Sequence, residues 1–141
     1  MVLLITYQFL KVFEDTKQKW NKHVLTYSIM NYTLKLAEDS VHRQIDYAFK
    51  VWSKHSKLEF EKVKRGNDKE RDIKISFCQK EHGDGCPFNG SGGVVVHGLF
   101  PSSGIGGDLQ FDNDENWTDK EIPAGNNLFA VAAHEMGHCL S

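Results

Sequence analysis

The sequence predicts one α/β domain built on a mixed β-sheet, and three observations support this fold class. Short segments rich in β-branched and aromatic residues have the composition and alternation of strands. One segment repeats apolar residues at helical spacing, and a helix-compatible apolar segment lies near the end of the chain. The order of strand, helix, further strands and a last helix is typical of an α/β domain, and 141 residues suit one domain.

Composition narrows the class of protein. With 40% hydrophobic residues, 26% charged residues and a formal net charge of -2, the chain is typical of a soluble globular protein. Lysine and arginine between Lys57 and Lys80 are interleaved with acidic residues, so we expect no nucleic-acid partner. Residues 1–10 are apolar but have no positive charge and no cleavage site, so we expect neither a signal peptide nor a membrane segment.

The first half of the chain predicts strand, helix, strand and strand. Residues 23–31 and 58–63 are rich in β-favouring side chains, and residues 73–77 alternate apolar with polar ones. Between the first two strands, Asp39 or Ser40 can cap a helix that should end near Ser56. Its apolar positions share one face: Val41, Ile45, Ala48 and Trp52.

The second half begins with a glycine-rich stretch, residues 81–93, which predicts tight turns after a polar loop at 64–70. Residues 94–100 predict the next strand, and residues 109–111 a further one. Asn126 or Asn127 is expected to cap a final helix that begins at Leu128.

Three cysteines leave at least one without a partner in the chain. Cys78 and Cys86 could close a small loop in an oxidising compartment, which would leave Cys139 as a thiol. Three reduced thiols in a reducing compartment fit the count equally well.

The final helix carries the H-E-x-x-H motif, His134-Glu135-Met136-Gly137-His138. Residues four apart share a helix face, so His134 and His138 can bind one zinc ion with Glu135 beside it. Zinc lowers the pKa of a bound water, and Glu135 as general base would take its proton before the water attacks a peptide carbonyl. Two surface histidines on an ordinary helix are the alternative, but the apolar residues before the motif favour the zinc site.

Several further stretches are more specific than this motif: His82-Gly83-Asp84, Pro87-Phe88-Asn89-Gly90, Gly104-Ile105-Gly106-Gly107-Asp108, Phe111-Asp112, Glu115-Asn116-Trp117 and Asn127-Leu128-Phe129. Together they resemble the catalytic domain of the matrix metalloproteinases, a family of metzincins. The resemblance covers residues 20–141 and leaves residues 1–19 as an N-terminal segment without a match. It implies an α/β (α+β) fold with a twisted, mixed five-stranded sheet and two long helices. The implied activity is that of a zinc-dependent metalloendopeptidase that hydrolyses internal bonds of extracellular-matrix-type proteins.

The resemblance also implies a second, structural zinc held by three histidines and one aspartate. The matching positions here are His82, Asp84, His97 and Gln110. Because a neutral glutamine is a poor zinc ligand, we expect this site to be weakened, completed by water or empty.

Two calcium sites are implied in the same way. One would use Asn89, Gly90, Gly92, Val94, Asp112 and Glu115, and its affinity should fall because Asn89 stands where the family has aspartate. The other would use Asp72, Gly104, Gly106 and Asp108. A solvated acidic loop is the alternative for Asp112 and Glu115.

Residues 94–99 resemble the edge strand above the active-site cleft of the family. The backbone at Val95 and Val96 could pair with an extended polypeptide substrate, although these valines could equally fill a core.

A metzincin takes its third zinc ligand from a histidine six residues after the second, which would be position 144. Because the sequence given stops at Ser141, where the family has glycine, we expect this polypeptide to lack the C-terminal subdomain and to be weak or inactive. Cys139 follows His138 and points elsewhere on the helix, which argues against its being the third ligand.

Two other readings remain open. One is a metal- and peptide-binding fragment without activity, and the other is a peptidase of the thermolysin kind with a distant glutamate ligand. The resemblance implies an extracellular location, which the N-terminal residues do not support.

Overall fold

The computed structural model describes residues 20–64, 71–79, 95–99, 107–120 and 125–140. Five strands form one sheet: β1 (Val24–Ile29), β2 (Glu59–Lys62), β3 (Ile73–Cys78), β4 (Val96–Gly98) and β5 (Leu109–Asp112). Their order across the sheet is β2-β1-β3-β5-β4. β1 runs parallel to both β2 and β3, β3 runs parallel to β5, and β4 is antiparallel to β5. The predicted mixed five-stranded sheet is therefore confirmed.

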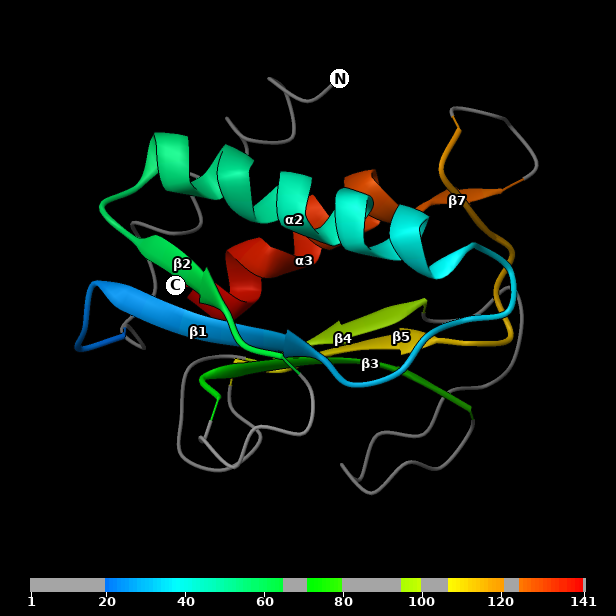
Figure 1. The fold of residues 1–141 in the computed structure, drawn as a ribbon, viewed down its shortest axis with the longest axis horizontal. Coiled ribbons are helices and arrows are strands. Elements are labelled where there is room, and N and C mark those ends of the chain that lie inside the picture. Colours follow the sequence, from blue (N-terminus) through cyan, green and yellow to red (C-terminus); the bar gives the residue numbers. More distant parts are fainter. Residues whose placement is uncertain (1–19, 65–70, 80–94, 100–106, 121–124, 141) are drawn as a thin grey trace.

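Two helices, α2 (Glu38–His55) and α3 (Leu128–Leu140), lie on the same face of this sheet (Figure 1). The apolar positions predicted for the first helix, Val41, Ile45, Ala48 and Trp52, are all buried. Trp52 also donates its indole N–H to the backbone oxygen of Ala133 at 2.7 Å, which ties α2 to α3. The long first helix thus holds the second one against the sheet.

The N-terminal cap predicted for the first helix was wrong. The helix begins at Glu38 after Ala37, and no side chain caps it. Ser40 lies inside the first turn and donates its hydroxyl to the Asp119 carboxylate at 2.8 Å, so a tertiary contact replaces the local cap. The end is as expected, because the helix stops at His55 and Ser56 follows as its C-cap.

The cap predicted for the last helix is confirmed at one of the two candidates. The side-chain oxygen of Asn127 accepts the backbone N–H of Ala130 at 2.9 Å, as an N-cap residue does. Asn126 instead donates its side-chain amide to Glu115 at 3.1 Å.

Two short strands were missed by the sequence patterns. β6 (Trp117–Thr118) and β7 (Asn126–Asn127) pair in parallel as a separate two-stranded sheet. Two residues are too few to show an alternating pattern. The strand predicted at residues 94–100 is shorter than expected, because only three residues pair with β5; Val94 and Phe100 lie outside the described residues.

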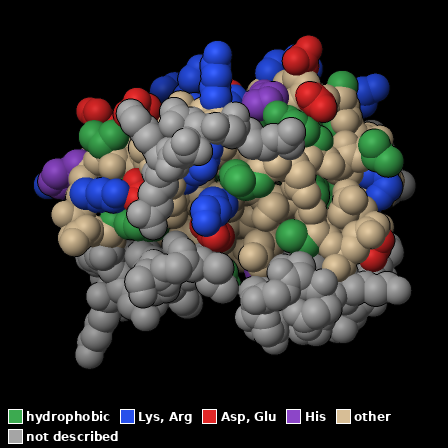
Figure 2. All heavy atoms as spheres, turned by 60° about the horizontal axis from the view of Figure 1, so that its bottom comes forward, with side chains coloured by type: hydrophobic (Ala, Val, Ile, Leu, Met, Phe, Trp, Pro, Cys, Tyr) green, Lys and Arg blue, Asp and Glu red, His purple; other side chains and the backbone are tan. Residues whose placement is uncertain are grey.

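Figure 2 brings forward the side of the sheet that faces away from the helices. On the part of this face that is described, cationic and acidic side chains are mixed rather than gathered by sign. None of the described helices is long and apolar enough to cross a membrane.

Candidate metal centre

Helix α3 places the three predicted active-site residues in one group. One ligand atom from each of His134, Glu135 and His138 lies within 4.8 Å of the others, the only such group of three or more among the described residues. The imidazole rings of the two histidines are 6.2 Å apart between centroids and lie at 63° to each other. The side chain of His134 is 49% exposed, so a metal held here would remain open to a substrate. The two imidazoles are ligands that zinc accepts, and the Glu135 carboxylate lies beside them.

Burial sets the electrostatics of this group. It raises the pKa of the Glu135 carboxyl to about 7, and the backbone N–H of Gly98, which donates to that carboxylate, opposes the shift. Burial also lowers the pKa of His134, and the charge of the nearby His138 acts in the same direction. The His134 imidazole is therefore biased toward the neutral form that binds metal. A cation beside Glu135 would lower its pKa again.

The edge strand β4 touches the helix at Gly98. A methyl group at this position would lie 2.8 Å from the backbone oxygen of Glu135 and 3.4 Å from the sulfur of Cys139. Since a real Cβ does not approach backbone this closely, only glycine lets the strand pack against the motif without displacing it. The role of Gly98 was not anticipated from the sequence, although a glycine within a strand pattern is a known sign of close backbone approach.

An apolar cavity of about 300 Å³ opens beside the metal-binding group. The edge segment lines one side and α3 the other, through Val95, Val96, Ala130, Val131, His134 and Glu135. The two valines expected to meet a substrate therefore lie beside the catalytic candidates. β4 has a sheet neighbour on one side only, β5, among the strands described.

The thiol of Cys139 is not one of the ligand atoms of this group. Its side chain is buried and its sulfur lies 3.5 Å from the backbone oxygen of Asp108, toward the sheet. Burial raises the pKa of this thiol well above its usual value. Both features agree with the expectation that Cys139 is not a zinc ligand. Cys86 lies outside the described residues, so its pairing with Cys78 stays a prediction.

The predicted structural zinc site is described only in part. His97 and Gln110 are opposite partners in the β4–β5 ladder, which is consistent with their belonging to one site. His82 and Asp84 lie outside the described residues. The weakened site therefore stays a prediction.

Two carboxylate residues of the first predicted calcium site, Asp112 and Glu115, are described. They lie three positions apart in the sequence, and both are buried. One oxygen of Asp112 accepts the backbone N–H of Asp114 at 2.9 Å, whereas the other, Oδ2, is buried without a hydrogen-bond partner in the described part of the chain. Burial raises the pKa of Asp112. An uncompensated buried carboxylate oxygen is what a hard cation would satisfy. The other expected ligands, Asn89, Gly90, Gly92 and Val94, lie outside the described residues.

At the second predicted calcium site, protein groups already engage both carboxylate oxygens of Asp72. Lys22 forms an ion pair with one oxygen of Asp72, and the backbone N–H and hydroxyl of Thr26 donate to the other at 2.8 and 3.1 Å. Despite burial, the hydrogen bonds and the charge of Lys22 hold the pKa of Asp72 below its usual value. Asp108 accepts the N–H of Lys74 at 2.9 Å, and burial raises its pKa to about 6. Lys22 was not anticipated from the sequence; Gly104 and Gly106 lie outside the described residues.

Comparison with known proteins decides the family. The sequence matches the matrixin family over residues 19–141. The chain belongs to the matrixin family. It is 48% identical over 122 residues to stromelysin-1 of Rattus norvegicus and to neutrophil collagenase of Homo sapiens, in each case 86% of this chain and 25% of the relative. It is 45% identical over 131 residues to matrix metalloproteinase-15 of Homo sapiens, 89% of this chain and 20% of that protein.

The resemblance to matrix metalloproteinases is thus confirmed, and so is the fold it implied. The chain spans about a quarter or less of the length of these relatives.

Proposed function

We propose that this matrixin chain supplies the zinc-binding and catalytic helix of a metalloendopeptidase that hydrolyses internal bonds of extracellular-matrix-type proteins outside the cell. The observation that carries the proposal is the group on α3, in which donor atoms of His134, Glu135 and His138 lie within 4.8 Å of one another beside an edge strand. Relatives named as collagenase and stromelysin support the substrate class.

Each residue of the group has a separate role. His134 and His138 bind zinc through imidazole nitrogens, and zinc supplies a Lewis acid that polarises a carbonyl and lowers the pKa of water. Glu135 takes the proton of the attacking water and later gives it to the leaving amine. The N–H of Gly98 holds the Glu135 carboxylate in place while it does so.

The edge segment positions the substrate. An extended peptide can add to β4 as a further strand, because main-chain hydrogen bonds form without regard to side chains. The adjacent apolar cavity, lined by Val95, Val96 and Val131, would accept one apolar side chain of that peptide. Cleavage would then occur where the peptide passes Glu135.

Calcium stabilises the fold through Asp112 and Glu115 in this proposal, since the buried Oδ2 of Asp112 needs a positive partner. We expect Asp112→Asn to weaken calcium binding and to remove most of the increase in melting temperature that calcium produces. Asp119→Asn is the matched control, because Asp119 already accepts a hydrogen bond from Ser40. Equal calcium responses in the two variants would contradict the assignment.

The test of the activity is turnover of a fluorogenic peptide by the zinc-loaded protein. Glu135→Gln should lower kcat by about 10²–10⁴-fold because it removes the base, while zinc content stays unchanged. Glu59→Gln, an exposed change on β2, should leave both unchanged. Hydrolysis by the Glu135→Gln protein at the unaltered rate would refute the proposed role.

A polypeptide limited to residues 1–141 offers two imidazoles from the zinc motif. We propose that such a polypeptide binds zinc weakly and acts at most as a metal- and peptide-binding unit. Zinc stoichiometry measured together with single-turnover cleavage separates this state from a working enzyme.

A further inference from the structure

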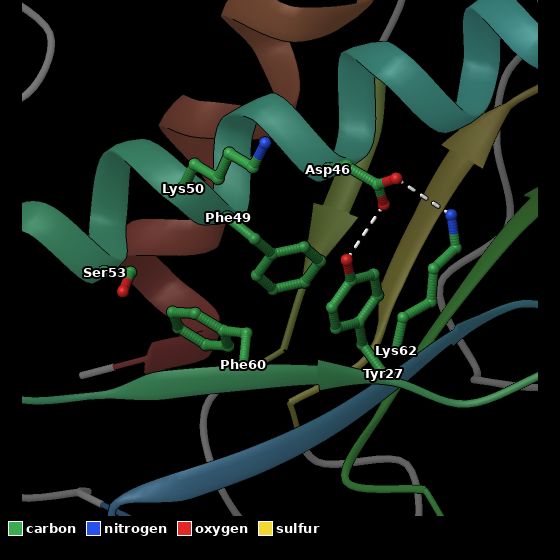
Figure 3. Close-up of a pocket in the computed structure, with 7 residues that line it drawn as sticks. All are labelled: Tyr27, Asp46, Phe49, Lys50, Ser53, Phe60 and Lys62. Atoms are coloured by element: carbon green, nitrogen blue, oxygen red, sulfur yellow. Dashed lines mark hydrogen bonds and ion pairs between the residues drawn. The ribbon is translucent and has the colours of Figure 1, made fainter.

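A second cavity lies between α2 and the opposite edge of the sheet, away from the α3 motif (Figure 3). Its volume is about 330 Å³, which falls in the range of small-molecule sites. Seven residues line it: Tyr27, Asp46, Phe49, Lys50, Ser53, Phe60 and Lys62. None of them belongs to the metal centre or to the substrate edge described above.

Local structure explains why these side chains meet. Asp46, Phe49, Lys50 and Ser53 follow the spacing that places residues on one face of a helix, and this face of α2 looks toward β2. On β2, Phe60 and Lys62 are two residues apart and share a face, so Glu59 and Glu61 point to the other side. The strand therefore presents an aromatic ring and a cation to the cavity, and directs its acidic side chains elsewhere.

Aromatic rings form the inner wall. Tyr27 stacks on Phe49 with ring centroids 4.0 Å apart and an angle of 28°. Phe60 lies against Phe49 at 4.8 Å and 44°. Phe49 is buried, whereas Phe60 is partly exposed and meets the open space. A flat apolar group could pack against the exposed side of these rings.

The polar rim has an excess of positive charge. The two carboxylate oxygens of Asp46 are both engaged, one by the Tyr27 hydroxyl at 2.8 Å and the other by the Lys62 ammonium at 2.9 Å. The exposed Lys50 and Ser53 complete the rim, and no ion pair of Lys50 is seen among the described residues. The lining therefore holds two lysines and one carboxylate, and the carboxylate is neutralised by Lys62. The charge of Lys50 is the excess, and it favours an anionic ligand.

We infer that this cavity binds a small molecule that carries an anionic oxygen group on an aromatic ring. The ring packs against Phe49 and Phe60. The anionic group accepts hydrogen bonds from the Lys50 ammonium and the Ser53 hydroxyl. The inference is independent of the proposed peptidase activity, because none of the lining residues belongs to the metal-binding group on α3.

Binding can be measured by ¹⁹F NMR with the intact protein loaded with zinc and calcium. 4-Fluorophenylacetate should bind saturably, and neutral 4-fluorobenzyl alcohol about tenfold or more weakly, because it lacks the charge. Competition by phenyl phosphate and by phenylacetate then decides whether phosphate or carboxylate is the better anionic group. Peptide hydrolysis is measured in parallel and reports on the metal centre alone.

Two variants with matched controls locate the site. Lys50→Glu should weaken 4-fluorophenylacetate by about tenfold or more, whereas the same charge change at exposed Lys120, outside the cavity, should leave its affinity within about twofold. Ser53→Trp should block the cavity, whereas His55→Trp, two residues along on the opposite side of the helix, should not. All four positions are exposed, so we expect the variants to fold.

Three results would overturn the inference. These are the absence of saturable binding, equal affinity for the acid and the alcohol, and binding that survives both Lys50→Glu and Ser53→Trp. Loss of binding with unchanged peptide hydrolysis would support it.

Discussion

A helix packs beside each edge of the sheet, α3 at the β4 edge and α2 at the β2 edge. The two edges differ in the side chains that line the cavity there. At the β4 edge, α3 packs closely because Gly98 has no side chain, and the cavity beside it is lined mainly by valines and alanine. At the β2 edge, α2 is held away by Phe49 and Phe60, and the cavity there has a charged rim. The small residues at the β4 edge bring α3, with its proposed metal-binding group, next to the edge strand. The large ones at the other leave room for a ligand.

The largest expected effect is a difference in zinc affinity between variants at the two edges of the sheet. His138→Ala removes one of two imidazoles of the group on α3, and we expect zinc affinity to fall by at least about a hundredfold, close to 3 kcal/mol. His42→Ala alters a histidine at the β2 edge, where it contacts Lys62 at 2.6 Å, and should leave zinc affinity unchanged. Isothermal titration with zinc measures both, and a similar loss in the two variants would remove the distinction.

The next effect tests the close packing at the β4 edge. Gly98→Ala places a methyl group 2.8 Å from the backbone oxygen of Glu135, so strand and helix must separate. We expect a loss of about 1–3 kcal/mol in the free energy of unfolding, together with slower peptide hydrolysis. Glu61→Ala on exposed β2 should change stability by less than about 0.5 kcal/mol. Urea denaturation that shows no difference between these variants would contradict the packing argument.

A smaller effect tests how the two helices are joined. Trp52→Phe removes the 2.7 Å hydrogen bond to the backbone of Ala133 and should cost about 1–2 kcal/mol of stability. Trp20 makes the same kind of bond to Cys139 at 2.7 Å but is less buried, so Trp20→Phe should cost less. The reverse order in thermal unfolding would show that Trp20 is the stronger tie to α3.

The smallest effect is on stability at high pH, and it concerns Tyr27, which lines the cavity at the β2 edge. Burial, with the hydrogen bond and charge of Asp46, raises the pKa of Tyr27 above its usual value, so the folded state favours the neutral phenol. The unfolded phenol ionises above a pH of about 10, so this contribution is complete below that pH and is lost as the pH rises further. Tyr27→Phe should therefore flatten the fall in stability above that pH. The exposed Tyr47→Phe should not, and parallel curves for all three proteins would exclude the linkage.

Much of the fold could be predicted because local patterns were strong. The apolar spacing from Val41 to Trp52 identified the first helix, and Asn127 capped the last one as expected. The cap at Asp39 or Ser40 failed because Ser40 found a tertiary partner, Asp119, seventy-nine residues away. Such a partner cannot be recognised from neighbouring residues.

The sequence by itself determined that His134 and His138 come together, because their four-residue spacing places both on one helix face wherever that helix lies. Only the tertiary structure decided what surrounds this group on α3. Gly98 meets Glu135, Lys22 reaches Asp72, and α2 meets β2 around a cavity through contacts between distant parts of the chain. Helical spacing is a local property of the backbone, whereas these contacts depend on how the sheet brings its edges against two helices.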